Sequence, residues 1–139
     1  MRPKKVLLAE DDLDDQKLFH DFLLHRTDIV LMSVVENGEE VLDTLKSITD
    51  FGHLPDLIIL DQNMPKKNGI QTLQVLKNDS RYSEIIVVIY STYADQQLIN
   101  LALKNGASKV VSKPITMEGY CQMMDDLLQL VPLKTTISK

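Results

Sequence analysis

The sequence predicts a doubly wound α/β fold, in which helices cover both faces of a parallel sheet. Short runs rich in Val, Ile and Leu recur along the chain, and several are apolar throughout instead of alternating with polar residues. Such runs are typical of parallel strands that are buried on both faces. Segments whose apolar residues lie three or four positions apart separate the runs, so strands and helices alternate along the chain.

Five of these runs are expected to form strands, because each is short and strongly apolar. They are Val6–Ala9, Ile29–Val35, Leu57–Leu60, Ile85–Tyr90 and Val110–Val111. A helix is expected after each strand, since apolar residues at helical spacing share one face. The five faces consist of Leu18, Phe19, Phe22 and Leu23; Val41, Leu42 and Leu45; Ile70, Leu73 and Leu76; Leu98, Ile99, Ala102 and Leu103; and Met117, Tyr120, Cys121, Met124, Leu127 and Leu128.

An acidic stretch, Glu10–Asp15, directly follows the first predicted strand. Asp12 is expected to be the N-cap of the first helix, with Asp15 at the third helical position in a capping-box arrangement. Asp14 and Asp15 would then lie at the positive end of the helix dipole. Glu10 and Asp11 remain at the carboxyl end of the strand.

Turn and capping residues mark the other boundaries. Asn37-Gly38 separates the second strand from its helix, and Asn105-Gly106 is expected to stop the fourth helix. Thr116 is the expected N-cap of the last helix, which Pro132 would end.

The composition indicates one globular domain. A chain of 139 residues with 44% apolar and 25% charged residues fits a single hydrophobic core. The net charge of −5 argues against a nucleic-acid or anionic-membrane partner. The single cysteine, Cys121, excludes an internal disulfide, and no apolar run reaches the length of a signal-peptide core or a membrane span. We therefore expect a cytoplasmic protein without a direct nucleic-acid or membrane partner.

Polar residues of different chemistry follow four of the predicted strands. Glu10 and Asp11 follow the first strand, Asp61 the third, Ser91 the fourth and Lys113 the fifth. Ligands of open α/β sheets bind outside the carboxyl ends of the strands. We therefore expect three acids, a hydroxyl and an amine to lie together at one edge of the sheet.

Three neighbouring carboxylates repel one another unless a cation neutralises them. A few oxygen ligands, with positions left open for water and phosphate, suit Mg²⁺. A carboxylate fixed beside such an ion can act as a nucleophile toward a phosphoryl group, and Asp61 directly follows the apolar run Leu57–Leu60 on the expected central strand. Ser91 and Lys113 would then contact the phosphoryl oxygens.

This ordered set of residues resembles the receiver domain of two-component response regulators. Residues 61–65 (DQNMP) with Gly69 are similar to the phosphorylation loop of that family, and residues 105–108 (NGAS) with Lys113-Pro114 resemble its last strand. The resemblance covers residues 4–131. It implies a flavodoxin-like five-stranded parallel sheet of order 2-1-3-4-5 with five helices. It also implies phosphoryl transfer from a sensor histidine kinase or a histidine phosphotransfer protein.

The resemblance also implies roles for single residues. Asp61 would be the phosphoacceptor, Ser91 the switch hydroxyl and Lys113 the phosphoryl contact, with a cis peptide bond before Pro114. Mg²⁺ would be held by Asp11 and Asp61, by Glu10 with the help of water, and by the backbone carbonyl of Asn63.

The sequence departs from the usual pattern of the family in three places. Ser91 replaces a more usual threonine, and Thr92 replaces a smaller residue. Val110 stands where many receivers carry an aromatic residue that rotates on activation. Either Tyr90 or Tyr93 is expected to substitute for that aromatic residue, unless activation is transmitted by loop and backbone movement alone.

The leading hypothesis is a stand-alone switch rather than an enzyme, with a receiver domain over residues 1–131, a polar tail over 132–139 and no output domain. The signal would leave through residues 95–131, to an unknown downstream protein or in a homodimer. The segment Asn78–Glu84 also resembles single-domain receivers that serve bacterial phytochrome kinases.

Three alternatives stay open. The first is a phosphorelay intermediate that passes phosphate onward. The second is a Mg²⁺-dependent phosphatase with an aspartate nucleophile, although Asn63 stands where such enzymes carry a second acid. The third is a receiver-like binding module that takes no phosphate, although that class usually lacks an acid or the lysine that this chain keeps.

Overall fold

The computed structural model describes residues 2–132, and in this part of the chain five strands alternate with five α-helices. The strands are β1 (Lys4–Ala9), β2 (Ile29–Val35), β3 (Leu57–Asp61), β4 (Ile86–Ser91) and β5 (Lys109–Ser112). The helices are α1 (Leu13–Leu23), α2 (Gly38–Lys46), α3 (Gly69–Lys77), α4 (Gln96–Lys104) and α5 (Met117–Leu128), with a 3₁₀ turn, η1, at Phe51–His53. The predicted tail lies outside the described residues except for Pro132.

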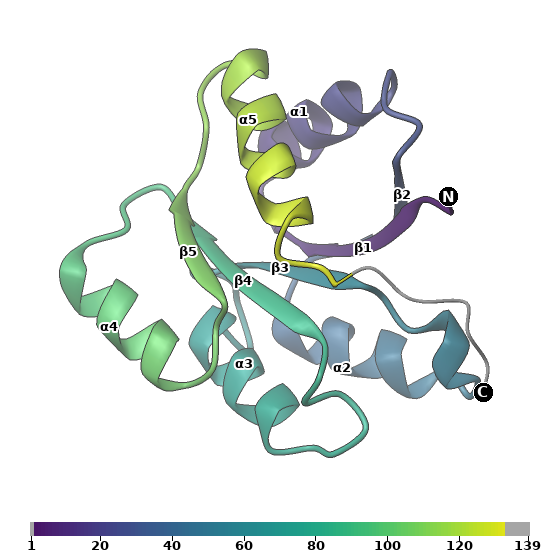
Figure 1. Ribbon diagram of the computed structural model, residues 1–139. Coiled ribbons are helices and arrows are strands. Elements are labelled where there is room, and N and C mark those ends of the chain that lie inside the picture. Colours follow the sequence, from purple (N-terminus) through teal and green to yellow (C-terminus); the bar gives the residue numbers. More distant parts are fainter. Residues whose placement is uncertain (1, 133–139) are drawn as a thin grey trace.

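The strands form one parallel sheet in the order β2-β1-β3-β4-β5 (Figure 1). This confirms the predicted fold class and strand order. The strand bounds differ from the prediction by a few residues, and two of these differences concern polar positions. Asp61 and Ser91 are the last residues of β3 and β4 rather than the first residues after them, so hydrogen bonding in the sheet fixes their backbone.

Helices α1 and α5 cover one face of the sheet, and α2, α3 and α4 cover the other (Figure 1). Successive strand residues therefore enter two separate cores. The core under α2–α4 takes alternate residues of the central strands, namely Leu7, Ala9, Ile58, Leu60, Val87 and Ile89. The core under α1 and α5 takes the others, namely Val6, Leu8, Leu57, Ile59, Val88 and Tyr90.

Aromatic side chains fill the centre of the core under α1 and α5. Phe19 of α1 packs edge-on against Tyr90 of β4 and against Tyr120 of α5, with ring centroids 6.5 and 5.8 Å apart. Phe22 stacks on Tyr120 at 6.1 Å. This aromatic cluster (Phe19, Phe22, Tyr90 and Tyr120) joins both helices to β4, and edge-to-face pairs of this kind add stability beyond the area they bury.

Side-chain caps begin all five α-helices, as expected for a chain rich in Asp and Asn at these boundaries. The predicted caps Asp12 and Thr116 are confirmed. The predicted stop of α4 is also confirmed, because Gly106 has a φ of +104°, which favours glycine. Helix α5 already ends at Leu128, four residues before the proline expected to end it.

No helix in residues 2–132 combines the length and apolar character needed to cross a bilayer.

Candidate functional site

The structure brings Glu10, Asp11, Asp61 and Lys113 together at the carboxyl edge of the sheet. Glu10 and Asp11 follow β1, Asp61 ends β3, and Lys113 follows β5. Strands β1 and β3 are neighbours although β2 lies between them in the sequence. The chain order therefore reverses at this point, which is where open α/β sheets bind ligands.

Three carboxylates form the floor of the site. One oxygen each of Glu10, Asp11 and Asp61 lies within 4.8 Å of the other two. The side chains of Glu10 and Asp61 are 0% and 4% exposed, whereas Asp11 is open to solvent. A hard divalent cation fits this donor set, because the oxygens converge and one side stays accessible to water and a ligand.

Lys113 crosses over these acids and partly neutralises them. Its Nζ lies 2.8 Å from Glu10 Oε1, 3.0 Å from Asp61 Oδ2 and 3.0 Å from Asp15 Oδ2. The lysine side chain is only 11% exposed. One ammonium group thus contacts three carboxylates, one directly after β1, one in β3 and one in α1, in surroundings where water screens the charges weakly.

The surroundings shift the pKa values of these groups in different directions. Burial and the adjacent Glu10 raise the pKa of Asp61 to about 7. Burial also acts to raise the pKa of Glu10, but its hydrogen bonds to Asp61, Lys113 and Tyr90 outweigh this and lower it. Burial opposes the charged form of Lys113, yet the three carboxylates raise its pKa above the usual range. The raised pKa values of Asp61 and Lys113 mean that positive charge is favoured beside these acids, so the site attracts a cation.

The loop after β3 is fastened close to Asp61. The backbone N–H of Asn63 donates to Asp61 Oδ1 at 3.1 Å, and Asn63 itself is exposed. Gln62 joins neighbouring elements, because its N–H donates to the Tyr90 carbonyl and its side-chain oxygen accepts from the N–H of Ile70 at the start of α3. These hydrogen bonds fix the backbone next to Asp61, and a reactive group must be held in one position in this way.

Ser91 lies at the same edge but does not bond to the acids. Its Oγ is 3.3 Å from both the N and the O of Tyr93, and its side chain is buried. The N–H of Lys113 donates to the Ser91 carbonyl at 2.8 Å. Thr92 and Tyr93 are exposed at the rim, and Tyr93 is 76% exposed.

The acidic stretch divides differently from the prediction at one position. Asp15 donates its backbone N–H to Asp12 Oδ1, which is one half of a capping box. The other half is absent, because the N–H of Asp12 donates to Glu10 Oε2 and the Asp15 carboxylate accepts from Lys113. The predicted capping-box role of Asp15 is therefore wrong, since a lysine from the far end of the chain attracts its carboxylate more strongly.

Replacing Asp12 with Ala should lower the free energy of unfolding by about 1 kcal/mol, the usual value of an N-cap. The cap bond to Asp15 would be lost, while the contacts of Lys113 with the acids would remain. Urea unfolding would measure this loss, with Asp14→Ala as the control in the same helical turn. Unchanged stability together with a weakened affinity for the cation would contradict the assignment of Asp12 to the helix alone.

Tyr90 belongs to the site by a contact that sequence reasoning did not foresee. Its hydroxyl donates to Glu10 Oε1 at 2.6 Å, and its ring is fully buried. The sequence shows an aromatic residue directly before Ser91, but this pattern predicts only a substitute for the aromatic residue that is missing at Val110. Val110 is half-buried and packs against the core under α2–α4, on the opposite face of the sheet from Tyr90.

The expected cis bond before Pro114 is wrong, because residues 2–132 contain no cis peptide bond. The trans form is the more stable one for an X-Pro bond by about 0.5–1 kcal/mol. Lys113 already contacts Glu10, Asp15 and Asp61 with a trans bond after it.

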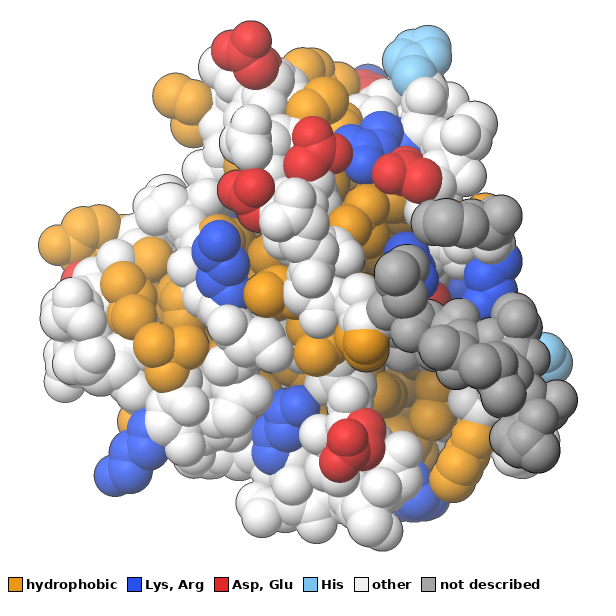
Figure 2. All heavy atoms as spheres, viewed as in Figure 1, with side chains coloured by type: hydrophobic (Ala, Val, Ile, Leu, Met, Phe, Trp, Pro, Cys, Tyr) orange, Lys and Arg blue, Asp and Glu red, His pale blue; other side chains and the backbone are white. Residues whose placement is uncertain are grey.

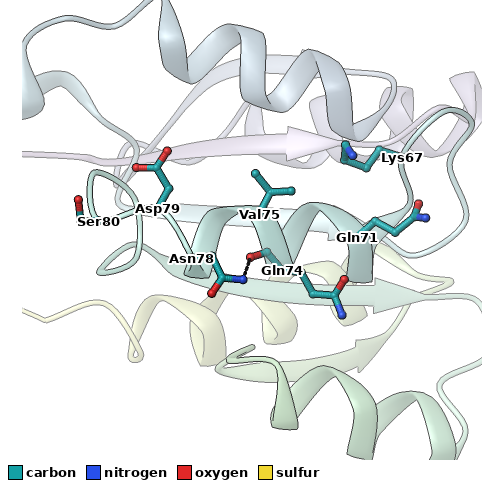
Figure 3. A pocket seen from close by; sticks show the side chains of 7 residues that line it. All are labelled: Lys67, Gln71, Gln74, Val75, Asn78, Asp79 and Ser80. Atoms are coloured by element: carbon teal, nitrogen blue, oxygen red, sulfur yellow. Dashed lines mark hydrogen bonds between the residues drawn. The ribbon is translucent and has the colours of Figure 1, made fainter.

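A hollow of about 730 Å³ lies on another part of the molecule, along the outer side of α3 (Figure 3). Its lining is mostly polar and includes Gln71, Gln74 and Asn78, whose side-chain amide donates to the Gln74 carbonyl. None of the site acids lines it. The hollow is open to solvent and lies apart from the acids of the sheet edge.

Known proteins with similar sequences include response regulators. The chain is 36% identical over 125 residues to the probable C4-dicarboxylate response regulator DctR of Bacillus subtilis, covering 90% of this chain and 52% of that protein. It is 29% identical over 129 residues to the polar-differentiation response regulator DivK of Brucella anthropi, covering 91% and 97%. The chain therefore spans about half the length of DctR and nearly all of DivK.

A solved structure with the same fold is that of the phosphorylated cyanobacterial phytochrome response regulator RcpA. It superposes with a TM-score of 0.76 at 27% identity, covering 93% of this chain and 94% of that chain. The family model of the response regulator receiver domain matches residues 6–125. With the sheet order, the acids at its edge and this match together, the chain belongs to the receiver domain family of two-component response regulators.

Proposed function

We propose that this chain is a phosphorylation-dependent signalling switch in which Asp61 accepts a phosphoryl group from a histidine kinase or a histidine phosphotransfer protein. One observation carries the proposal. A nearly buried carboxylate ends the central strand, with two further acids beside it and a lysine that contacts it. This arrangement provides a nucleophile, a cation site and a positive group for the incoming phosphoryl oxygens.

The cation would be Mg²⁺, held by Asp11 and Asp61, by Glu10 with the help of water, and by the backbone carbonyl of Asn63. When bound, Mg²⁺ supplies positive charge beside the phosphoryl oxygens and offsets the repulsion among the acids. The exposed carboxylate of Asp11 and the solvent-facing side of the cluster support this assignment.

The residues of the chain have distinct tasks in the proposed transfer. A carboxylate oxygen of Asp61 forms the new P–O bond as the P–N bond to the donor histidine breaks, and the bonding electron pair stays on the imidazole nitrogen. Lys113 leaves its contacts with Glu10 and Asp15 and pairs with a phosphoryl oxygen. The Ser91 hydroxyl leaves the Tyr93 backbone and donates to another phosphoryl oxygen.

The partner that donates the phosphoryl group would dock on the rim of the site. Four exposed apolar side chains lie on segments next to the acids and to Lys113, and they are 45–95% exposed. They are Leu13, Tyr93, Ile115 and Met117. Because Asp61 is buried, a protein donor must contact these segments to reach it, and apolar contacts surrounding a polar centre are typical of protein interfaces.

Phosphorylation of the intact chain tests the proposal. Acetyl phosphate with Mg²⁺ should add one phosphoryl group per chain, detected by intact mass, and the adduct should be lost slowly. Asp61→Asn should abolish the adduct, whereas Asp14→Asn, an exposed acid on α1, should leave it unchanged. No adduct on the wild type, or one that survives Asp61→Asn, would contradict the proposal. Sustained turnover of an aryl phosphate would favour the phosphatase instead.

For the output we propose the surface formed by residues 95–131, which a downstream protein or a second copy of the chain would contact. Figure 2 shows hydrophobic side chains gathered over α4, where Leu101 and Leu103 are 44% and 49% exposed. Helix α5 contributes less apolar surface than its sequence predicts. Of its five apolar residues in the segment 117–124, Met117 and Cys121 are exposed, whereas Tyr120, Met123 and Met124 are buried.

The pathway is a further part of the proposal. The resemblance to RcpA supports a phytochrome-linked kinase as donor, and we place the exchange in the cytoplasm. A relay role stays an alternative. Transfer of phosphate from the labelled chain onto an isolated histidine phosphotransfer protein would favour it over an end-point switch.

A further inference from the structure

Tyr90 is the residue of the site whose role the family does not account for. It lies one position before the switch hydroxyl, with its side chain on the opposite face of β4 from Val87 and Ile89. The ring belongs to the aromatic cluster, while the hydroxyl points to the acids and donates to Glu10 Oε1 at 2.6 Å. A tyrosine phenol keeps its proton at neutral pH, so the Tyr90 hydroxyl is the donor in this bond.

The Glu10 carboxylate is held from several directions. Oε1 accepts from Tyr90 and also lies 2.8 Å from Lys113 Nζ, and Oε2 accepts from the N–H of Asp12 at 3.0 Å. The ammonium group of Lys113 in turn lies 5.0 Å from the centre of the Tyr90 ring, within the range of a cation–π contact. Tyr90 thus touches both the acid and the lysine that competes with a cation for that acid.

The two donors to Oε1 differ in a way that matters for cation binding. Lys113 brings a full positive charge, which repels an incoming divalent cation, and it is the group that turns to the phosphoryl oxygen. Tyr90 brings a neutral hydroxyl, which satisfies Oε1 without cancelling its negative charge. After Lys113 has left, Tyr90 and Asp12 remain to orient the buried carboxylate, and the aromatic cluster keeps the Tyr90 ring in place.

We propose that Tyr90 is a positioning residue for the cation site. Its hydroxyl fixes the orientation of the Glu10 carboxylate and keeps that orientation when Lys113 moves away. Hydrogen-bond partners of the groups that hold a metal act in this way, and their loss typically weakens metal affinity by about 10–100-fold. Because Glu10 would act through water, we expect the low end of that range here. The inference rests on the proposed function, because it takes Glu10 as part of a Mg²⁺ site. It adds a residue that no role in phosphoryl transfer had required.

Calorimetric titration of the intact chain with Mg²⁺, without any phosphoryl donor, tests this role. Tyr90→Phe keeps the ring and removes only the hydroxyl, and we expect its Mg²⁺ affinity to be about tenfold weaker. Tyr120→Phe is the matched control, because Tyr120 is equally buried in the same aromatic cluster. Its affinity should stay within about twofold of the wild type, since Glu10 accepts no hydrogen bond from it among the described residues.

A second pair of variants shows that the effect passes through Glu10. In a Glu10→Gln background, Tyr90→Phe should change Mg²⁺ affinity no further, because the carboxylate it positions is gone. Thermal melting with and without Mg²⁺ reports on folding and binding together, and the stabilisation by Mg²⁺ should shrink in Tyr90→Phe but not in Tyr120→Phe.

The outcomes separate this inference from the proposed function. Wild-type affinity in Tyr90→Phe, with binding still abolished by Asp11→Asn, would overturn the role of Tyr90 and leave the proposed function standing. An equal loss in the Glu10→Gln background would also overturn it. A wild type that binds no Mg²⁺, or binds it independently of Asp11, would overturn the cation site and the proposed function together.

Discussion

Replacing Lys113 with Met is expected to lower the free energy of unfolding by about 3 kcal/mol when no divalent cation is present. The lysine is the ammonium group shared by Glu10, Asp61 and Asp15, and two of these acids are almost fully buried. Removing one partner of a buried ion pair leaves its charges uncompensated, which is far more costly than losing a surface pair. Met keeps the length and the apolar stem of the side chain, so the loss comes from the charge.

Mg²⁺ should restore most of the stability of Lys113→Met, because it supplies positive charge to the same acids. Urea unfolding with Mg²⁺ and with a chelator would measure both effects. Lys104→Met is the control, since Lys104 is exposed on α4 and its loss should change stability by no more than about 0.5 kcal/mol. A loss that is equal with and without Mg²⁺ would contradict the view that lysine and cation serve the same charges.

The sheet and most of the site could be predicted because both follow from a local rule. Parallel strands end at the same edge, so the residues after each apolar run had to meet there. Glu10, Asp61 and Lys113 did meet, without any knowledge of the helices between them. The N-cap Asp12 was also predictable from a local rule, because a cap bonds only within its own helical turn.

The contacts that were missed join residues far apart in the sequence. Asp15 has the right spacing for a capping box, yet its carboxylate bonds to Lys113, 98 residues away. Tyr90 is recognisable in the sequence as an aromatic residue beside Ser91, but its bond to Glu10 depends on which side of β4 it faces. A local sequence pattern determines which hydrogen-bonding groups a side chain has, whereas the assembled sheet determines which partner it bonds to.

A second class of missed feature is the close approach of two helices. The sequence Asn37-Gly38 predicts a boundary between a strand and a helix, and Asn37 does cap α2. Gly38, however, is the first residue of that helix and is buried against the start of α3, where its N–H donates to the Lys67 carbonyl at 3.0 Å. A side chain at this position would meet Thr72 Oγ1, the Lys67 carbonyl oxygen at 2.8 Å and Lys67 Cβ at 2.9 Å.

Gly38→Ala is therefore expected to destabilise the protein by about 2 kcal/mol, against the usual trend for a helix. In an open helix interior, Ala would be favoured over Gly by roughly 1 kcal/mol. Here the added methyl group overlaps the Thr72 hydroxyl and also the Lys67 carbonyl, a backbone group that cannot rotate away, and overpacking of this kind costs about 1–3 kcal/mol. Urea unfolding would measure the loss, with Gly52→Ala as the control, since a side chain there would have no contact closer than 3.3 Å.

The double variant Gly38→Ala with Thr72→Ala identifies the source of the loss. Thr72 Oγ1 is the nearest obstruction and donates to the Asn68 carbonyl, so Thr72→Ala alone should be mildly destabilising. Adding Gly38→Ala to it should cost less than in the wild type, because one of the overlapping atoms is gone. Some loss should persist, since the Lys67 carbonyl stays in place. Strict additivity, or a stabilising Gly38→Ala, would show that α2 and α3 do not approach as closely as Gly38 requires.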